Sequence, residues 1–82
     1  MEVWVITDWM GCIIGVYSTA VGAFVKTIKN IMGLERIDDA AKRNAIVQLT
    51  KEFTENPNEF HCSLQEENEY SLFVERVEVD KD

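Results

Sequence analysis

The sequence predicts an α+β domain in which an antiparallel sheet of about four strands carries two helices on one face. Two segments rich in β-branched and aromatic residues open the chain, and apolar residues alternate with polar ones near its C-terminal end. Between these segments, apolar residues recur at the three-and-four spacing of amphipathic helices. The element order is therefore β-β-α-α-β-β, and 82 residues suffice for a single domain, 1–82.

Residues 2–7 and 12–17 are the predicted strands of an N-terminal hairpin. The connection 8–11 is short and ends in Gly11, as hairpin turns commonly do. Because the first strand is apolar on both of its faces, we expect it to lie at the centre of the sheet or to be covered on both sides.

A first helix is predicted to begin after Ser18 or Thr19, whose hydroxyl can accept a hydrogen bond from an unpaired amide of the first turn. Gly33 matches the left-handed residue that commonly follows the last turn, and Leu34 is placed to fold back over that turn. The helix would bury one apolar stripe, made up of Val21, Phe24, Val25, Ile28, Ile31 and Met32.

A second helix is predicted over residues 38–55, with Asp38 or Asp39 as its N-terminal cap. It would end at Asn56, because the residue before Pro57 is pushed out of the helical region. Its buried stripe would consist of Ala41, Ala45, Ile46, Leu49 and Phe53.

After Pro57 the apolar period changes to two, which predicts two strands joined by a polar turn at 66–69. The apolar phase of the last strand slips by one residue across 75–76, so that it resumes at Val77 and Val79. Such a slip indicates a β-bulge or a strand that changes its partner. The apolar positions before the slip are Phe60, Cys62, Leu64, Tyr70, Leu72 and Val74.

The cysteine content and the chain start predict a reduced, cytoplasmic protein. Two cysteines without a CxxC pair are few for a disulfide-dependent secreted domain, and no basic segment opens the chain as in a signal peptide. The uncharged segment 9–25 is the alternative, since Gly11 and Gly15 have the spacing of packed membrane helices. This segment is shorter than the roughly 20 residues that span a bilayer.

Motifs for catalysis, metals and cofactors are weak, so the sequence predicts a non-enzymatic protein without metal or cofactor. His61 and Cys62 are adjacent and would point to opposite faces of a strand, which favours a buried thiol and a histidine at the rim over a catalytic pair. A zinc site from Cys12, Cys62, His61 and Asp8 would lack the short paired spacing of structural zinc. No phosphate-binding glycine motif is present.

Acidic residues are concentrated in the C-terminal part of the chain. Residues 52–82 hold ten acidic and two basic residues, and the whole chain has a net charge of −7, which disfavours direct binding to nucleic acid. A shared acidic surface would steer basic partners, whereas scattered acids would only maintain solubility and protect an edge strand. On alternating strands, one face or edge would collect Glu59, Glu67, Glu69, Glu75, Glu78 and Asp80.

Trp9 and Met10 are large apolar residues in a turn, where polar residues are usual. Trp9 either folds back towards the core or stays exposed as an anchor, since tryptophan is enriched among residues that dominate binding energy.

Three segments carry a resemblance to a known group of proteins: 3–8 (VWVITD), 14–19 (IGVYST) and 73–80 (FVERVEVD). They resemble small, uncharacterised phage and bacterial proteins in which a strand hairpin steps into a helix and an acidic strand closes the chain. The resemblance covers about thirty residues at the two ends and implies a phage-like origin without a catalytic motif. The chain departs from this pattern at 20–22, where the group has acidic residues, and the helix at 38–55 has no counterpart.

Two functional hypotheses follow, and a homodimer is expected under either. In the first, the protein is a phage-encoded inhibitor whose carboxylates mimic nucleic acid and occupy a basic surface of a host defence or nucleic-acid-handling protein. Trp9 and Met10 would add an apolar anchor to the acidic residues named above. In the second, the protein binds or sequesters a nucleotide signal in a pocket at a dimer interface. The basic residues available for that role are Arg36, Lys42 and Arg43.

Overall fold

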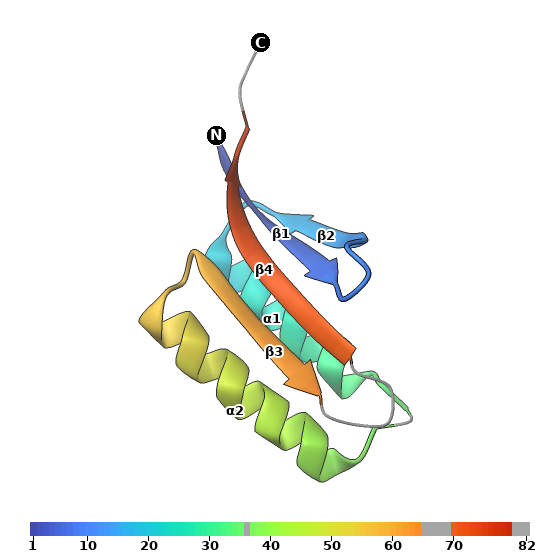
Figure 1. Cartoon of the computed structure of the whole chain (residues 1–82). Helices are drawn as coiled ribbons and strands as arrows, with labels where there is room; N and C mark the ends of the chain where they lie inside the picture. The colour runs from blue at the N-terminus through green and yellow to red at the C-terminus, as the bar shows by residue number, and fades with distance from the viewer. Residues whose placement is uncertain (36, 65–69, 80–82) are drawn as a thin grey trace.

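The computed structural model describes residues 1–35, 37–64 and 70–79, and it confirms the predicted α+β fold and element order (Figure 1). A four-stranded antiparallel sheet, with the strand order β2-β1-β4-β3, carries two helices on one face. β1 lies at the centre, as predicted. The elements are β1 (Glu2–Asp8), β2 (Ile13–Tyr17), α1 (Ala20–Met32), α2 (Asp39–Glu55), β3 (Glu59–Leu64) and β4 (Tyr70–Glu78).

The strand register divides the side chains of the sheet between two faces. Ile6 pairs with Val74, Val74 pairs with Phe60, and all three are buried against the helices; we call this the covered face. The opposite side, which neither helix covers, is the open face (Figure 1). The open face comprises Val3, Val5, Thr7, Ile13, Val16, Glu59, His61, Ser63, Ser71, Phe73, Glu75 and Val77.

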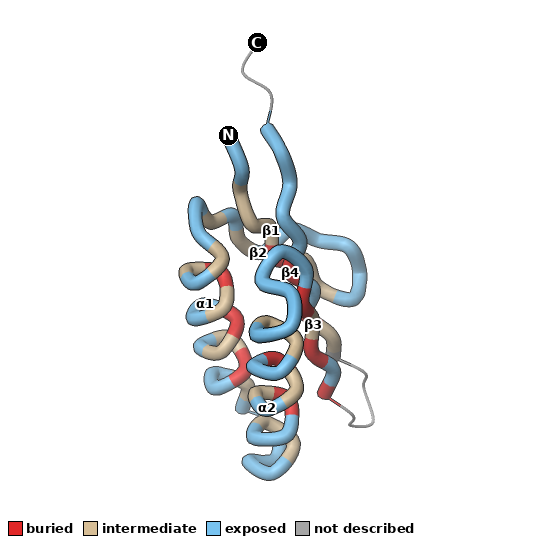
Figure 2. The backbone as a smooth tube through the Cα atoms, turned by 90° about the vertical axis from the view of Figure 1, so that its left-hand side faces the viewer, coloured by how far each residue is buried: buried red, intermediate tan, exposed pale blue. Residues whose placement is uncertain are grey.

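Three phenylalanines join both helices to the covered face. Phe24 of α1 stacks on Phe53 of α2, with ring centroids 4.3 Å apart, and the ring of Phe60 from β3 packs edge-on against Phe53 at 5.1 Å. Aromatic pairs at such distances stabilise a core beyond the area they bury. Figure 2 shows the buried positions of α1 and α2 on their inner sides, so both helices pack against the same face of the sheet.

The stripe that α1 buries is rotated from the predicted one. Ala23, Thr27 and Ile31 are fully buried. Thr27 tolerates burial because its hydroxyl donates a hydrogen bond to the Ala23 carbonyl oxygen at 2.8 Å, and the small Ala23 lets the helix approach the sheet. The prediction counted only large apolar residues, and it was wrong for three that are exposed: Val21, Val25 and Met32.

The N-terminal cap of α1 agrees with the prediction, whereas the conformation at its C-terminal end does not. Thr19 is the N-cap, and its hydroxyl accepts a hydrogen bond from the Gly22 amide at 3.0 Å. Gly33 does not adopt the expected left-handed conformation, because its φ is −80° and its amide still donates to the Lys29 carbonyl. The chain therefore leaves α1 through a continued right-handed turn, after which Leu34 packs against the core as predicted.

α2 begins after Asp38 and ends before Asn56, as predicted. Asp38 caps the helix through its backbone carbonyl rather than its side chain, since that carbonyl accepts from the Lys42 amide at 3.0 Å. α2 also covers the outer edge of β3, where the Gln48 side chain accepts a hydrogen bond from the Ser63 amide. The predicted stripe is confirmed for Ala45 and Leu49, which are buried, and for Ile46 and Phe53, which pack against the core.

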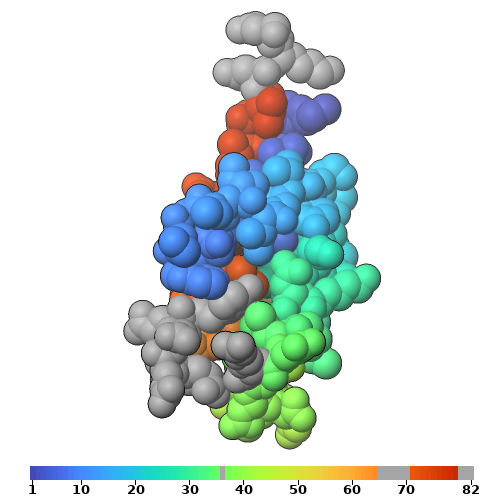
Figure 3. Space-filling view, turned by 90° about the vertical axis from the view of Figure 1, so that its right-hand side faces the viewer, coloured from blue at the N-terminus to red at the C-terminus, as the bar shows by residue number. Residues whose placement is uncertain are grey.

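The slip in the apolar phase of β4 marks a change of partner rather than a bulge. β4 pairs with β1 without interruption from Leu72 to Glu78, whereas its pairing with β3 ends at Glu75. The irregularity lies instead between β1 and β2, where Ile14 has no partner in the register. Figure 3 shows the β1–β2 hairpin, in blue, lying across this side of the molecule beside α1.

The uncharged segment 9–25 is divided among the β1–β2 turn, β2 and the start of α1. In the part of the chain that the structure describes, no helix combines the length and the apolar character needed to cross a membrane.

We expect opposite effects from alanine at two glycines. Gly11 has a φ of +81°, so Gly11→Ala should lower the free energy of unfolding by about 1 kcal/mol, because a β-carbon is disfavoured in the left-handed region. Gly33 is right-handed and its added β-carbon would meet only ordinary contacts, so Gly33→Ala should be neutral or stabilising by up to about 1 kcal/mol. Urea unfolding of the wild type and both variants measures these changes in the free energy of unfolding. A destabilised Gly33→Ala or an unaffected Gly11→Ala would contradict the assigned backbone conformations.

Candidate functional site

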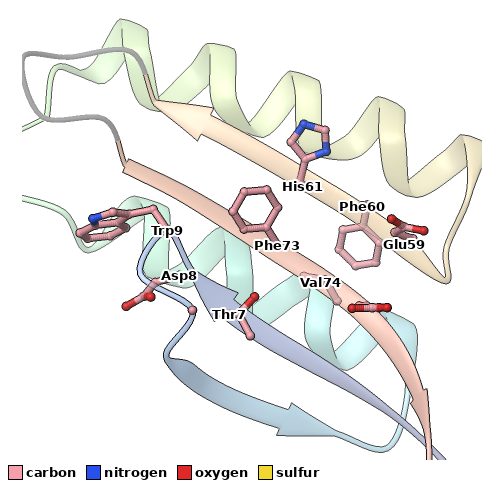
Figure 4. A pocket seen from close by; sticks show the side chains of 10 residues that line it. Thr7, Asp8, Trp9, Glu59, Phe60, His61, Phe73 and Val74 are labelled. Carbon is pink, nitrogen blue, oxygen red and sulfur yellow. The ribbon is translucent and has the colours of Figure 1, made fainter.

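A hollow of about 430 Å³ lies on the open face, next to the β1–β2 turn (Figure 4). Residues from three strands and the turn meet there, although they are distant in sequence. Figure 4 shows Phe73 in the middle of the hollow, with Trp9 towards one end and Glu59 towards the other. The lining residues are Thr7, Asp8, Trp9, Gly11, Glu59, Phe60, His61, Phe73, Val74 and Glu75.

Strand pairing places the centre of the hollow. Thr7 is opposite Phe73, and Phe73 is opposite His61, so the three side chains form one row across β1, β4 and β3. The rings of His61 and Phe73 are stacked, with centroids 5.8 Å apart and an interplanar angle of 19°. This row gives the hollow an aromatic floor that remains in contact with solvent, since Phe73 is 43% exposed.

His61 is held in place by α2. Its Nδ1 lies 2.8 Å from Glu52 Oε1, so an acidic side chain of the helix reaches around the edge of β3 to the open face. The sequence predicts a rim position for His61, and it predicts neither His61 nor Phe73 as a site residue. A signal for Phe73 was present, because it stands between Leu72 and Val74 and makes this stretch of the strand apolar on both faces.

The β1–β2 turn fixes the end of the hollow at which Trp9 lies. Asp8 Oδ1 accepts hydrogen bonds from the amides of Met10 and Cys12, both at 2.9 Å, and the positive φ of Gly11 completes the turn. An aspartate that bonds to backbone amides ahead of it is a common way to stabilise such a turn. Trp9 is 49% exposed and Met10 is 75% exposed, so neither belongs to the buried core.

Two of the six predicted carboxylates meet at the hollow. Glu59 and Glu75 are directly opposite each other on β3 and β4, and both are exposed. Among the described residues neither forms an ion pair. Like charges directly opposite across a sheet are destabilising, so this pair reduces the stability of the free protein.

The other predicted carboxylates do not join this pair in the described part of the chain. Glu78 lies opposite Glu2 on the other face of the sheet, so the prediction of one common face fails for it. Arg76 offsets the charge there, because its Nη1 lies 3.0 Å from Glu2 Oε1. Glu67, Glu69 and Asp80 lie outside the described residues.

Of the basic residues of the nucleotide hypothesis, Lys42 and Arg43 are not part of the hollow. Lys42 is half-buried and its Nζ donates to the Met32 carbonyl oxygen at 3.3 Å, which ties α2 to the end of α1. Arg43 is exposed on α2, and Arg36 lies outside the described residues.

The two thiols lie in different environments. Cys12 is exposed, whereas Cys62 is fully buried and belongs to the core. Burial raises the pKa of the Cys62 thiol from 9.0 to about 11, and the nearby Glu52 adds to this rise while a backbone hydrogen bond with Leu72 opposes it. A thiol with this pKa supplies little thiolate near neutral pH, so its position favours packing over nucleophilic chemistry. Within the described ranges, no group of three metal-ligating side chains is assembled.

The raised pKa of Cys62 predicts a loss of stability in alkaline solution. The unfolded chain releases this proton near pH 9 and the folded chain near pH 11, so the free energy of unfolding should fall between these values, by about 2–3 kcal/mol in total. Urea unfolding of the wild type and of Cys62→Ala, below pH 9 and near pH 11, isolates the effect. Cys12→Ala is the matched control and should retain the wild-type pH dependence. Parallel pH profiles for the wild type and Cys62→Ala would contradict the burial of a protonated thiol.

Comparisons with protein-family models, with curated protein sequences and with solved structures find no match for this chain. The resemblance of its ends to phage and bacterial proteins therefore stays a prediction. The function has to be proposed from the geometry of the open face and its hollow.

Proposed function

We propose that this protein is a non-enzymatic binding protein whose open face docks onto a basic surface of a partner protein. The observation that carries this proposal is the pairing of Glu59 with Glu75 beside exposed aromatic residues. Two unneutralised carboxylates lie at one end of the hollow, Phe73 lies at its centre and Trp9 lies towards the other end, so the surface is both negatively charged and apolar. Such a surface suits a partner that presents positive charges on apolar stems.

An apolar strip continues the open face beyond the hollow. Val5 is opposite Val16, and Val3 is opposite Val77, so valines from β2, β1 and β4 lie side by side. Val16 and Val77 are exposed, and Val3 and Val5 are half-buried. Contiguous exposed apolar surface next to polar groups is typical of protein interaction sites.

A binding interface explains the positions of Glu59 and Glu75 better than a role in solubility does. Acids that only maintain solubility need no particular neighbours, and scattered positions would avoid repulsion. Glu59 and Glu75 instead lie directly opposite each other, next to an apolar strip that water solvates poorly. Both costs are offset when a basic partner covers the open face.

The partner class that we favour is a nucleic-acid-handling protein. Such proteins cluster lysine and arginine to neutralise phosphates, and a chain with a net charge of −7 would be attracted to that surface over a long range. Carboxylates of the open face would then take the place of phosphates. If the chain is phage-encoded, as its resemblance implies, the partner would be a host defence protein and the result would be inhibition.

A capture experiment with matched charge reversals tests this proposal. The wild type, Glu59→Lys/Glu75→Lys and the control Glu35→Lys/Glu55→Lys are immobilised and exposed to a bacterial extract, and the retained partner is then purified. Both double variants change the net charge equally, but only the first alters the open face. We expect the open-face variant to weaken binding of the purified partner by about tenfold or more, while the control keeps most of it.

Competition with nucleic acid completes this test. A duplex that the partner binds should displace the wild-type protein, and high salt should weaken the complex. Equal affinity for the two double variants, or simultaneous binding of the protein and the duplex, would contradict the proposed mode of action. Retention of no protein by the wild type would also count against it.

A further inference from the structure

We propose that the hollow binds the guanidinium group of an arginine side chain presented by the partner. This inference rests on the proposed function and specifies the group that the open face recognises. The hollow, at about 430 Å³, falls within the size range of small-ligand sites and is large enough for one side chain.

The floor of the hollow suits a flat cation. Phe73 is stacked with His61 on one side and is exposed to solvent, so an aromatic surface is available at the centre of the hollow (Figure 4). Guanidinium groups are planar and weakly hydrated, and they stack on aromatic rings with cation–π attraction. An ammonium group is compact and strongly hydrated, and it has no flat face to place on such a surface.

The charge in the hollow is also suited to arginine. The Cα atoms of directly opposite residues in an antiparallel pair are about 4.5–5.5 Å apart, so the carboxylates of Glu59 and Glu75 can approach one ligand from neighbouring strands. A guanidinium group carries five N–H donors in a fixed plane and can donate to both carboxylates at once. One cation would then relieve the repulsion of two anions.

The other acids near the hollow are already used within the protein. Both amide hydrogen bonds that organise the β1–β2 turn go to Asp8 Oδ1, and Glu52 is paired with His61. In the part of the chain that the structure describes, Glu59 and Glu75 are the lining acids whose carboxylates have no hydrogen bond or ion pair at all. The aromatic floor and this acidic pair come from different pairings of the same two strands, so the site is built by the sheet itself.

A peptide titration monitored by NMR tests the inference. The probes are three capped tripeptides, acetyl-Gly-X-Gly-amide, in which X is arginine, lysine or citrulline, the uncharged analogue of arginine. The arginine peptide should cause saturable shifts at Thr7, Trp9, His61 and Phe73. Its affinity should exceed that of the citrulline peptide by about tenfold or more and that of the lysine peptide by several-fold.

Variants separate a specific site from general attraction to an acidic protein. Glu59→Gln/Glu75→Gln should abolish the saturable shifts, and urea unfolding should show that this variant is at least as stable as the wild type. Phe73→Val should reduce the preference for arginine over lysine. Glu35→Gln/Glu55→Gln removes the same charge elsewhere and should leave binding unchanged.

The outcomes distinguish this inference from the proposed function. Equal binding of the arginine and citrulline peptides, or shifts that spread over all acidic regions, would overturn the arginine site. If the arginine site fails but charge reversal at the hollow still prevents partner capture, the proposed function stands without it. If the hollow binds arginine but charge reversal leaves partner capture intact, the proposed function fails instead.

Discussion

The packing of Phe24, Phe53 and Phe60 is the interaction on which the rest of the structure depends. It holds α1 and α2 on the same face of a four-stranded sheet, and so both helices bury their inner sides against that face. A chain of 82 residues has no further helix to cover the other side in its described part. The properties of the open face are therefore set by strand alternation, because residues between the core positions must point away from the helices.

The hollow follows from this arrangement and from two local restraints. Strand pairing brings Phe73 next to His61 and Glu59 next to Glu75. The contact between His61 Nδ1 and Glu52 Oε1 joins the open face to α2 across the edge of β3. The hydrogen bonds that Asp8 accepts shape the turn at the other end. Together these contacts give the open face the shape and charge on which the proposed binding role rests.

Local patterns in the sequence predicted the elements and the covered face but not the hollow. Period-two alternation located Phe60, Cys62 and Leu64, since it depends only on neighbours along the chain. The order β2-β1-β4-β3 depends on long-range pairing, so the adjacency of Glu59 and Glu75 was predicted only as part of a wider acidic surface. The two errors of prediction in α1 both involve hydrogen bonds of the helix that the apolar pattern does not show. Thr27 can be buried because a hydrogen bond inside α1 satisfies its hydroxyl, and Gly33 stays right-handed because its amide still donates to the Lys29 carbonyl.

Docking of a partner on the open face requires that this face is in contact with water in the free protein. A neutral gadolinium chelate added to the labelled protein tests it, because the chelate accelerates relaxation only of protons that it can approach. We expect strong relaxation of the Val16 and Val77 methyl groups and of the Phe73 ring, and little effect on the Leu49 and Leu72 methyl groups of the core. Protection of the open-face protons to the level of the core would contradict the account, because it would mean that another part of the chain or a second copy already covers this face.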